Sequence, residues 1–258
     1  MIEPDDTQHP DFITALARGL SVIRAFDRTH PKMTMADVAH RTGLPRATVR
    51  RSLFTLKALG YVASDGKYFT LSPSILCLGY SYMGSTPLPG LIQPFLDEIT
   101  STTGLSSSAA VFDGREIVYI ARSASQRIMA IDLGVGSTLP AYCTSMGRVL
   151  LAAQPPDRLT AYLTGVARPI LTPHTVTDEL HLRQIIDQTR RQGWAAVDQE
   201  LELGLWSLSV PVRDQSGMVV AAMNVSQPAT QAMGYEAVEH LLPILRHAAE
   251  RLGPALPH

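Results

Sequence analysis

The stretch TMADVAHRTGLPRATVRRSLFTLKALGYV, residues 34–62, contains two helical patterns with a tight turn between them. Thr34 is suited to be the N-cap of a helix over about 35–42, and Gly43-Leu44 supplies the turn. Pro45 suits the first position of a second helix, because its missing N–H has no partner there in any case. Two helices joined by a short turn that contains glycine predict a helix-turn-helix, a motif that binds DNA.

The second helix of this motif has an apolar side and a basic side. At about 100° per residue, four apolar residues share an arc of roughly 120°, which we expect to pack on the other helices: Val49, Leu53, Leu56 and Leu59. The remaining side is basic and hydroxylic, as a helix in the major groove requires. A basic helix face that contacts only solvent is the alternative. The expected DNA-binding residues, one of them on a following hairpin, are Pro45, Arg46, Thr48, Arg50, Arg51, Thr55, Lys57 and Lys67.

The flanking segments predict a winged form of the motif. Upstream, an amphipathic helix is indicated by apolar residues at spacings of three and four, namely Ile13, Leu16, Leu20, Ile23 and Phe26. Downstream, two β-prone runs, 61–63 and 68–71, flank Asp65-Gly66, a dipeptide suited to a hairpin turn. A linker helix is then expected, with apolar residues suited to packing against a second copy of the chain.

Charge divides the chain in the same way. Residues 13–86 contain ten Lys and Arg against three Asp, a net charge of +7, whereas 1–12 and 87–258 each sum to −4. A basic block on an otherwise acidic chain points to a nucleic-acid-binding domain joined to a domain of another kind. We therefore expect a disordered acidic tail over 1–12, a winged helix-turn-helix domain over 13–72, the linker helix over 73–87 and a second domain over 88–258.

The second domain has the pattern of an α+β fold. Strands are predicted over 105–112, 116–121, 127–133 and 194–198, and two more are joined across DQSG, residues 214–217. Helices are predicted over 91–104, 147–154, 156–163, 177–192 and 234–252. Antiparallel strands flanked by helices are typical of sensor domains related to GAF and PAS modules, so we expect a GAF-like effector-binding domain with an antiparallel sheet.

The stretch LPAYCTSMGRVLLA, residues 139–152, raises the question of chemistry. A thiol or serine enzyme would need a general base beside Cys143 or Ser145. The candidates His174 and His181 fall in segments that have the pattern of a loop and an exposed helix, so we treat an enzyme as a remote alternative. The histidines have no metal spacing, and phosphate-binding glycine motifs are absent, so we expect neither metal nor cofactor.

Local patterns instead favour a binding role for 139–152. Thr144 and Ser145 precede a helix that begins near Met146 or Gly147, where hydroxyls and free backbone N–H groups can receive a carboxylate. Arg148, in the first turn, either neutralises that anion or bridges to neighbouring structure. The chain has no signal-peptide pattern, no apolar run of membrane-spanning length, and two cysteines without disulfide spacing. We therefore expect a cytoplasmic protein that does not bind a membrane.

Four spaced stretches resemble the IclR-type transcriptional regulators: ARGLSVIRAF, GLPRATVRRSLFTLKALGYV, LPAYCTSMGRVLLA and VDQELELGLWSLSVPVRDQSGMVVAAMNVS. The similarity runs from about Ile13 to Leu252. It is strongest to the branch that controls protocatechuate, 4-hydroxybenzoate and β-ketoadipate catabolism. The resemblance implies a homodimer or a dimer of dimers, a double-stranded DNA operator and a small organic acid effector. It also implies contact with RNA polymerase if the protein is an activator; the sequence leaves the sign of regulation open.

The resemblance also implies the position of the effector. Together with the helix entry at 144–148, the expected effector-binding residues are Ile128, Thr144, Ser145, Met146, Gly147, Arg148, Val197, Asp198, Leu205, Ser207, Asn224 and Ser226. Strand alternation supports the last two pairs, because residues 205 and 207 share a face, as do 224 and 226.

Two positions depart from the family pattern. Val197 stands where relatives that bind short acids have an acidic residue, which favours a bulkier or less polar ligand, and Trp206 replaces an arginine found in many relatives. Alternation points Trp206 away from Leu205 and Ser207, so it either lines the pocket or lies behind it. The leading hypothesis is an aromatic-acid regulator with a small aromatic or dicarboxylic acid as effector. A regulator that responds to a short aliphatic acid or a xenobiotic is the alternative.

Overall fold

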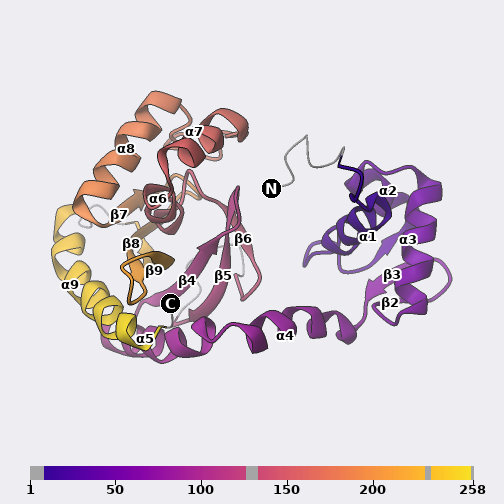
Figure 1. Cartoon of the computed structure of the whole chain (residues 1–258), viewed down its shortest axis with the longest axis horizontal. Coiled ribbons are helices and arrows are strands. Elements are labelled where there is room, and N and C mark those ends of the chain that lie inside the picture. Colours follow the sequence, from indigo (N-terminus) through magenta and orange to yellow (C-terminus); the bar gives the residue numbers. More distant parts are fainter. Residues whose placement is uncertain (1–8, 126–132, 230–233, 257–258) are drawn as a thin grey trace. The chain divides into compact units, whose positions relative to one another are not determined.

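The computed structural model describes residues 9–125, 133–229 and 234–256. The chain forms two compact units, Met1–Ser85 and Thr86–His258 (Figure 1). Each unit has its own apolar core. Most of the tail expected over 1–12, and most of the strand expected over 127–133, lie outside the described residues.

The first unit is a winged helix-turn-helix, as predicted. Its elements are α1 (Thr14–Arg24), β1 (Met33–Thr34), α2 (Met35–Thr42), α3 (Arg46–Ala58), β2 (Val62–Ser64), β3 (Tyr68–Leu71), a 3-10 turn (Pro73–Ile75) and α4 (Leu76–Ser85). The wing is an antiparallel sheet in the order β1-β3-β2. The sequence did not indicate β1, a two-residue strand in which Met33 pairs with Phe69.

Local capping chemistry fixes the boundaries of the helix-turn-helix. The backbone N–H of Thr34 donates to the Asp37 carboxylate at 2.8 Å, and the Thr34 hydroxyl accepts from the Asp37 N–H at 3.3 Å. Two of the donors that a helix start leaves free are therefore satisfied. Gly43 ends α2 with φ +67°, a conformation that favours glycine, and Pro45 is the N-cap of α3.

Two predicted apolar faces of this unit are wrong in part. Leu59 was expected to pack, but its side chain is 63% exposed. On α1, Val22 is fully buried, whereas Leu16 and Leu20 are exposed. Helix α3 packs against one flank of α1 only, so part of the apolar stripe of α1 stays on the surface.

The second unit is an α+β domain, as predicted. Its elements are α5 (Leu88–Thr103), β4 (Ser106–Phe112), β5 (Glu116–Ser123), β6 (Thr138–Pro140), α6 (Ser145–Ala152), α7 (Pro156–Gly165), α8 (Glu179–Gln192), β7 (Ala195–Asp198), β8 (Leu205–Arg213), β9 (Val219–Pro228), α9 (Gly234–Leu252) and a 3-10 turn (Gly253–Ala255). The six strands form one antiparallel sheet in the order β6-β5-β4-β9-β8-β7. The short strand β6 was not predicted.

Helices cover both faces of this sheet (Figure 1). Helices α5 and α9 pack on one face, where they share a core with Leu208, Met223 and Val225. Helices α6, α7 and α8 belong to the core of the opposite face, which includes Ala110 and Ala222. A strand residue can therefore contribute to a site beside α6 only if its side chain points toward this second face.

Strand alternation sets which residues of β7, β8 and β9 point toward α6. Ser207 of β8 lies between Val197 of β7 and Ser226 of β9 in the register, and Leu205 lies two residues before Ser207 on the same face. Trp206 points the other way, into the core shared with α5 and α9. It therefore lies behind the α6 face of the sheet.

Candidate functional site

A small cavity lies between the start of α6 and the sheet. Among the described residues its lining is Tyr119, Leu139, Cys143, Thr144, Ser145, Met146, Val197, Leu201, Leu205, Ser207, Asn224 and Ser226. Eight of these were predicted from the sequence, in segments up to 82 residues apart. The cavity measures about 20 Å³, room for one or two water molecules. An organic acid can enter only if the walls move apart.

The start of α6 is held firmly against the preceding strand. The Thr144 hydroxyl accepts from the Gly147 N–H at 3.2 Å and donates to the Pro140 carbonyl at 2.9 Å. A Cβ at position 147 would lie 2.1 Å from the Ala141 carbonyl oxygen, so only glycine fits there. Ser145 and Met146, the first two residues of α6, line the cavity.

Two buried polar atoms in the cavity have no hydrogen-bond partner within the described part of the chain. They are the Ser145 hydroxyl oxygen and the Asn224 side-chain oxygen. The other end of the Asn224 amide donates to Ser226 at 3.1 Å. Buried polar groups are nearly always paired, so these two atoms indicate a place for polar groups of a ligand.

Arg148 does not face the cavity, because its guanidinium forms a buried ion pair. Its Nη2 lies 2.7 Å from a carboxylate oxygen of Glu200, and both side chains are more than nine-tenths buried. Its Nε donates to the Tyr142 carbonyl at 3.1 Å. Of the two roles considered for Arg148, the structure has the bridge to neighbouring structure and not the neutralised effector.

The ion pair fixes a loop that forms one wall of the cavity. Glu200 also accepts from the Val176 N–H at 3.0 Å, and the Thr175 hydroxyl donates to the Glu200 carbonyl at 2.7 Å. Gln199, with φ +57°, turns the chain out of β7, and its side chain accepts from the Gly204 N–H. Leu201, on this loop, is thereby held against the cavity.

Three predicted effector residues do not line the described cavity, and a fourth cannot be placed. Gly147 and Arg148 lie behind it, and Asp198 is exposed and pairs with Trp206, on the opposite side of the strand from Val197. Ile128 lies outside the described residues. The sequence reasoning missed Tyr119, Leu139, Cys143 and Leu201. Alternation along the predicted strand 116–121 was the available signal for Tyr119.

Cys143 is poorly suited to nucleophilic chemistry. Its side chain is fully buried, and this burial raises the pKa of the thiol to about 12. The thiolate is the reactive form, so Cys143 is almost entirely protonated at neutral pH. His174 and His181 are exposed and do not line the cavity described above.

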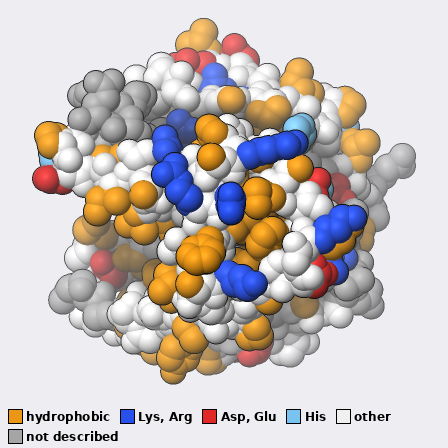
Figure 2. Space-filling model, turned by 90° about the vertical axis from the view of Figure 1, so that its right-hand side faces the viewer, with side chains coloured by type: hydrophobic (Ala, Val, Ile, Leu, Met, Phe, Trp, Pro, Cys, Tyr) orange, Lys and Arg blue, Asp and Glu red, His pale blue; other side chains and the backbone are white. Residues whose placement is uncertain are grey.

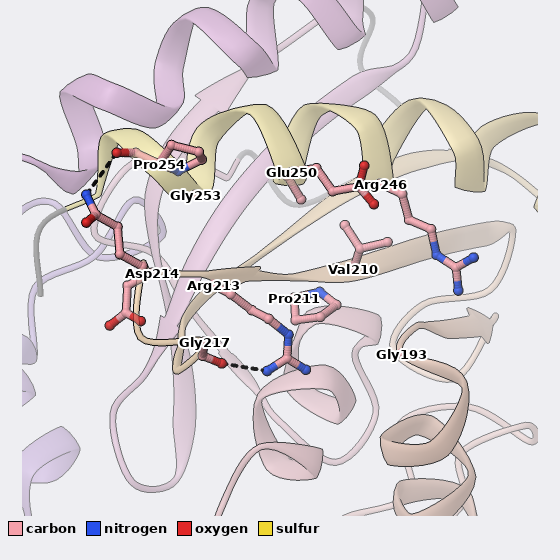
Figure 3. A pocket seen from close by; sticks show the side chains of 12 residues that line it. Gly193, Val210, Pro211, Arg213, Asp214, Gly217, Arg246, Glu250, Gly253 and Pro254 are labelled. Atoms are coloured by element: carbon pink, nitrogen blue, oxygen red, sulfur yellow. Dashed lines mark hydrogen bonds between the residues drawn. The ribbon is translucent and has the colours of Figure 1, made fainter.

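A second, larger hollow lies at the far end of β8 and β9 (Figure 3). Its volume is about 770 Å³, and its cationic side chains are Arg213 and Arg246. Both already donate to backbone carbonyls, Arg213 to Gly217 at 2.8 Å and Arg246 to Gln192 at 2.9 Å. Figure 3 shows the Arg213 guanidinium turned toward Gly217. We therefore place the candidate effector site in the smaller cavity.

The first unit carries a second candidate site, on α3 and the wing. The predicted DNA-binding residues Pro45, Arg46, Arg50, Arg51, Thr55, Lys57 and Lys67 are exposed. Thr48 is 8% exposed, because α1 packs on that flank of α3, so its side chain is not open to DNA. Phe54, which was not predicted, is 73% exposed on the same helix.

Among the residues that the structure describes, no group of three or more His, Cys, Asp or Glu is placed to hold a metal ion. No helix in the same part of the chain is long and apolar enough to cross a membrane.

Two models of known protein families match most of the chain. Residues 15–66 match the IclR helix-turn-helix domain, and residues 80–253 match the C-terminal domain of bacterial transcriptional regulators of the IclR type. The chain belongs to the IclR family. It is a DNA-binding transcriptional regulator and not an enzyme, which removes the alternative of a nucleophile at Cys143 or Ser145.

Individual IclR-family proteins are similar over nearly the whole chain. The Pca regulon regulatory protein of Pseudomonas putida is 47% identical over 95% of this chain and 85% of its own length. The p-hydroxybenzoate hydroxylase transcriptional activator of Acinetobacter baylyi is 33% identical over 96% and 93%. A solved IclR homologue from Microbacterium hydrocarbonoxydans, complexed with 4-hydroxybenzoate, is 26% identical, with a TM-score of 0.77 over 93% and 97%.

Proposed function

We propose that this IclR-family regulator controls genes of aromatic-acid catabolism and that its effector is an aromatic monocarboxylic acid bound in the α6 cavity. The names of the two relatives above, and the 4-hydroxybenzoate in the solved homologue, support the pathway. The chemistry of the cavity supports the class of acid.

The balance of polar and apolar groups in the cavity favours one carboxylate and an apolar body. Met146, Val197, Leu201 and Leu205 supply apolar walls. Among the described residues no lysine or arginine lines the cavity. A second carboxylate would be buried without a cation, which is costly. A dicarboxylate such as β-ketoadipate therefore fits less well than a hydroxybenzoate, and a short aliphatic acid leaves the apolar walls uncovered.

The observation that carries this proposal is the pair of unpartnered atoms on Ser145 and Asn224. Ser145 begins α6, where backbone N–H groups favour an anion, so we assign the carboxylate to this end. Asn224 lies on β9 and would bond the ring hydroxyl. Because the cavity is nearly closed, the acid must bind an opened arrangement better than the present one, and that difference would be the signal passed to the DNA-binding unit.

The test is calorimetric binding of 4-hydroxybenzoate, protocatechuate, β-ketoadipate, glyoxylate and pyruvate to the full chain. We expect a hydroxybenzoate to bind best. Ser145→Ala should weaken binding of this acid about tenfold, because a hydrogen bond to a charged group is lost. The same substitution should leave the free protein as stable as before, since the hydroxyl has no partner to lose.

Ser209→Ala is the matched control. Ser209 is fully buried two residues from Ser207 on the same strand, but its hydroxyl already donates to the Met223 carbonyl at 2.8 Å. It should not change effector affinity. Preferential binding of β-ketoadipate or glyoxylate, or equal loss in both variants, would contradict the proposal. Transcription with RNA polymerase, with and without the preferred acid, would then give the sign of regulation.

We also propose that the first unit forms a homodimer through the apolar flank of α1. A hollow of about 590 Å³ lies between α1, α3 and α4, lined by Leu16, Leu20, Leu59 and Leu78 among others, and these four are exposed. Leu76, Tyr80 and Tyr82 of α4 are also exposed. Contiguous apolar surface of this kind marks an interaction site, and a two-fold dimer would present two α3 helices to two DNA half-sites.

A further inference from the structure

The exposed Phe54 ring lies in the middle of the basic face of α3. With about 100° per residue, Arg50 and Lys57 fall roughly 40–60° to one side of it and Arg51 about 60° to the other. The opposite face of α3 is buried through Val49, Leu53 and Leu56. Figure 2 turns the side with α3 and the wing to the viewer and shows Lys and Arg side chains set around hydrophobic ones.

This setting determines what can cover the ring. A single exposed apolar residue on a protein surface is ordinary and needs no partner. Here, however, an apolar protein partner would have to bury Arg50, Arg51 and Lys57 together with the ring. Duplex DNA meets both needs, because phosphates pair with the cations while the major groove presents the apolar C5-methyl group of thymine.

We propose that Phe54 is a specificity-determining residue that contacts the methyl group of one thymine in each operator half-site. A phenyl ring has no hydrogen-bonding group, so it distinguishes thymine from the other bases by this methyl alone. The exposed arginines and Lys57 supply affinity to any sequence, and Phe54 adds discrimination at one base pair. The inference rests on the DNA-binding role of the family and on the orientation of α3.

The experiment begins with selection of a preferred site from a randomised DNA duplex library by the full-length chain. Each thymine of the selected duplex is then replaced in turn by deoxyuridine, which lacks only the methyl group. We expect one position in each half-site at which replacement weakens binding about fourfold, the value for burial of one methyl-sized group. Placing 5-methylcytosine, paired with guanine, at that position should bind better than unmodified cytosine.

Three variants separate Phe54 from its neighbours. Phe54→Ala should weaken the selected site and abolish the difference between thymine and deoxyuridine, whereas Phe54→Leu should keep much of it. Lys57→Ala should weaken all sequences alike and reduce the salt dependence by about one phosphate contact. Because Phe54 is largely exposed, Phe54→Ala should unfold at the same temperature as the wild type.

Each other outcome would overturn the proposal in a distinct way. If every deoxyuridine duplex binds the wild type equally, Phe54 does not contact a methyl group. If methyl sensitivity persists in Phe54→Ala, another residue makes that contact. A change in association state of Phe54→Ala during sedimentation would assign the ring to a contact between copies. If no sequence is selected at all, the DNA-binding role itself fails, which is a separate result.

Discussion

Arg148 illustrates how tertiary partners decide the role of a single residue. In the sequence it stands in the first turn of a helix, beside the hydroxyls that were expected to hold an anion. In the folded chain it pairs with Glu200, 52 residues away, and both are buried. Glu200 therefore neutralises the positive charge of Arg148 within the protein. The polar groups that line the cavity are neutral.

Removing one partner of this pair should lower the stability of the folded protein. Glu200→Gln keeps the shape of the side chain but leaves the Arg148 charge buried without compensation, so we expect a loss of about 3–5 kcal/mol in the free energy of unfolding. Denaturant titration followed by tryptophan fluorescence measures this, because both tryptophans, Trp194 and Trp206, lie in the same unit.

The matched control is an ion pair of equal length on the surface. Arg251 and Glu98 also approach to 2.7 Å, but their side chains are 45% and 53% exposed. Glu98→Gln should therefore cost less than about 1 kcal/mol. Equal losses in the two variants would mean that burial of the Arg148–Glu200 pair does not set its contribution.

At the scale of an element, α2 depends on its N-terminal cap. Thr34→Ala removes the hydroxyl that accepts from the Asp37 N–H, and loss of such a cap costs about 1 kcal/mol. Thr34→Ser keeps the hydroxyl and should retain most of the stability. Amide hydrogen exchange over residues 35–42 measures the effect on the helix itself. Unchanged protection in Thr34→Ala would show that packing alone holds α2.

The cap also predicts a dependence on pH. Hydrogen bonds from the Thr34 hydroxyl and backbone N–H lower the pKa of the Asp37 carboxyl from its ordinary 3.8. A carboxyl whose pKa falls on folding stabilises the folded state above pH 3.8, and the stabilisation is lost as pH falls through the lowered value. Near neutral pH, α2 should therefore be better protected from exchange in the wild type than in Asp37→Asn, and the size of this difference should not depend on pH. Below pH 3.8 this difference should shrink. A difference that stays constant in acid would exclude the carboxylate as its cause.

At the scale of the whole molecule, the exposed flank of α1 predicts paired DNA-binding units. In the double variant Leu16→Asp, Leu20→Asp, each carboxylate would be buried in the proposed interface, so association through this flank should fail. The wild type should bind a duplex with two half-sites at least tenfold more tightly than a duplex with one. The double variant should lose this gain. Quantitative mobility shifts on the two duplexes measure it.

The control for this prediction is Leu180→Asp on α8. Leu180 is 71% exposed, more than Leu16, but it belongs to the effector unit and not to the unit that contains α1 and α3. It should leave the gain from the second half-site unchanged. If the Leu16, Leu20 double variant also keeps the full gain, the proposed dimer contact is wrong.

Most of the architecture could be predicted because its signals are local. Capping at Thr34 and Asp37, the left-handed turn at Gly43 and the proline before α3 involve atoms within a few residues of one another. The family resemblance indicated Leu205, Ser207, Asn224 and Ser226, and strand alternation supported the shared face within each pair. The three-residue strand β6 was too short to give a periodic signal.

The sequence by itself determined the two-part plan of a DNA-binding helix pair and an α+β effector domain, since helix caps, turns and alternation act over short distances. Only the tertiary structure decided which of these side chains are free to act. Packing of α1 buried Thr48 and left Phe54 exposed, and Glu200 engaged Arg148 across 52 residues. Such choices depend on contacts between distant segments, and neither propensity nor spacing along the chain encodes them.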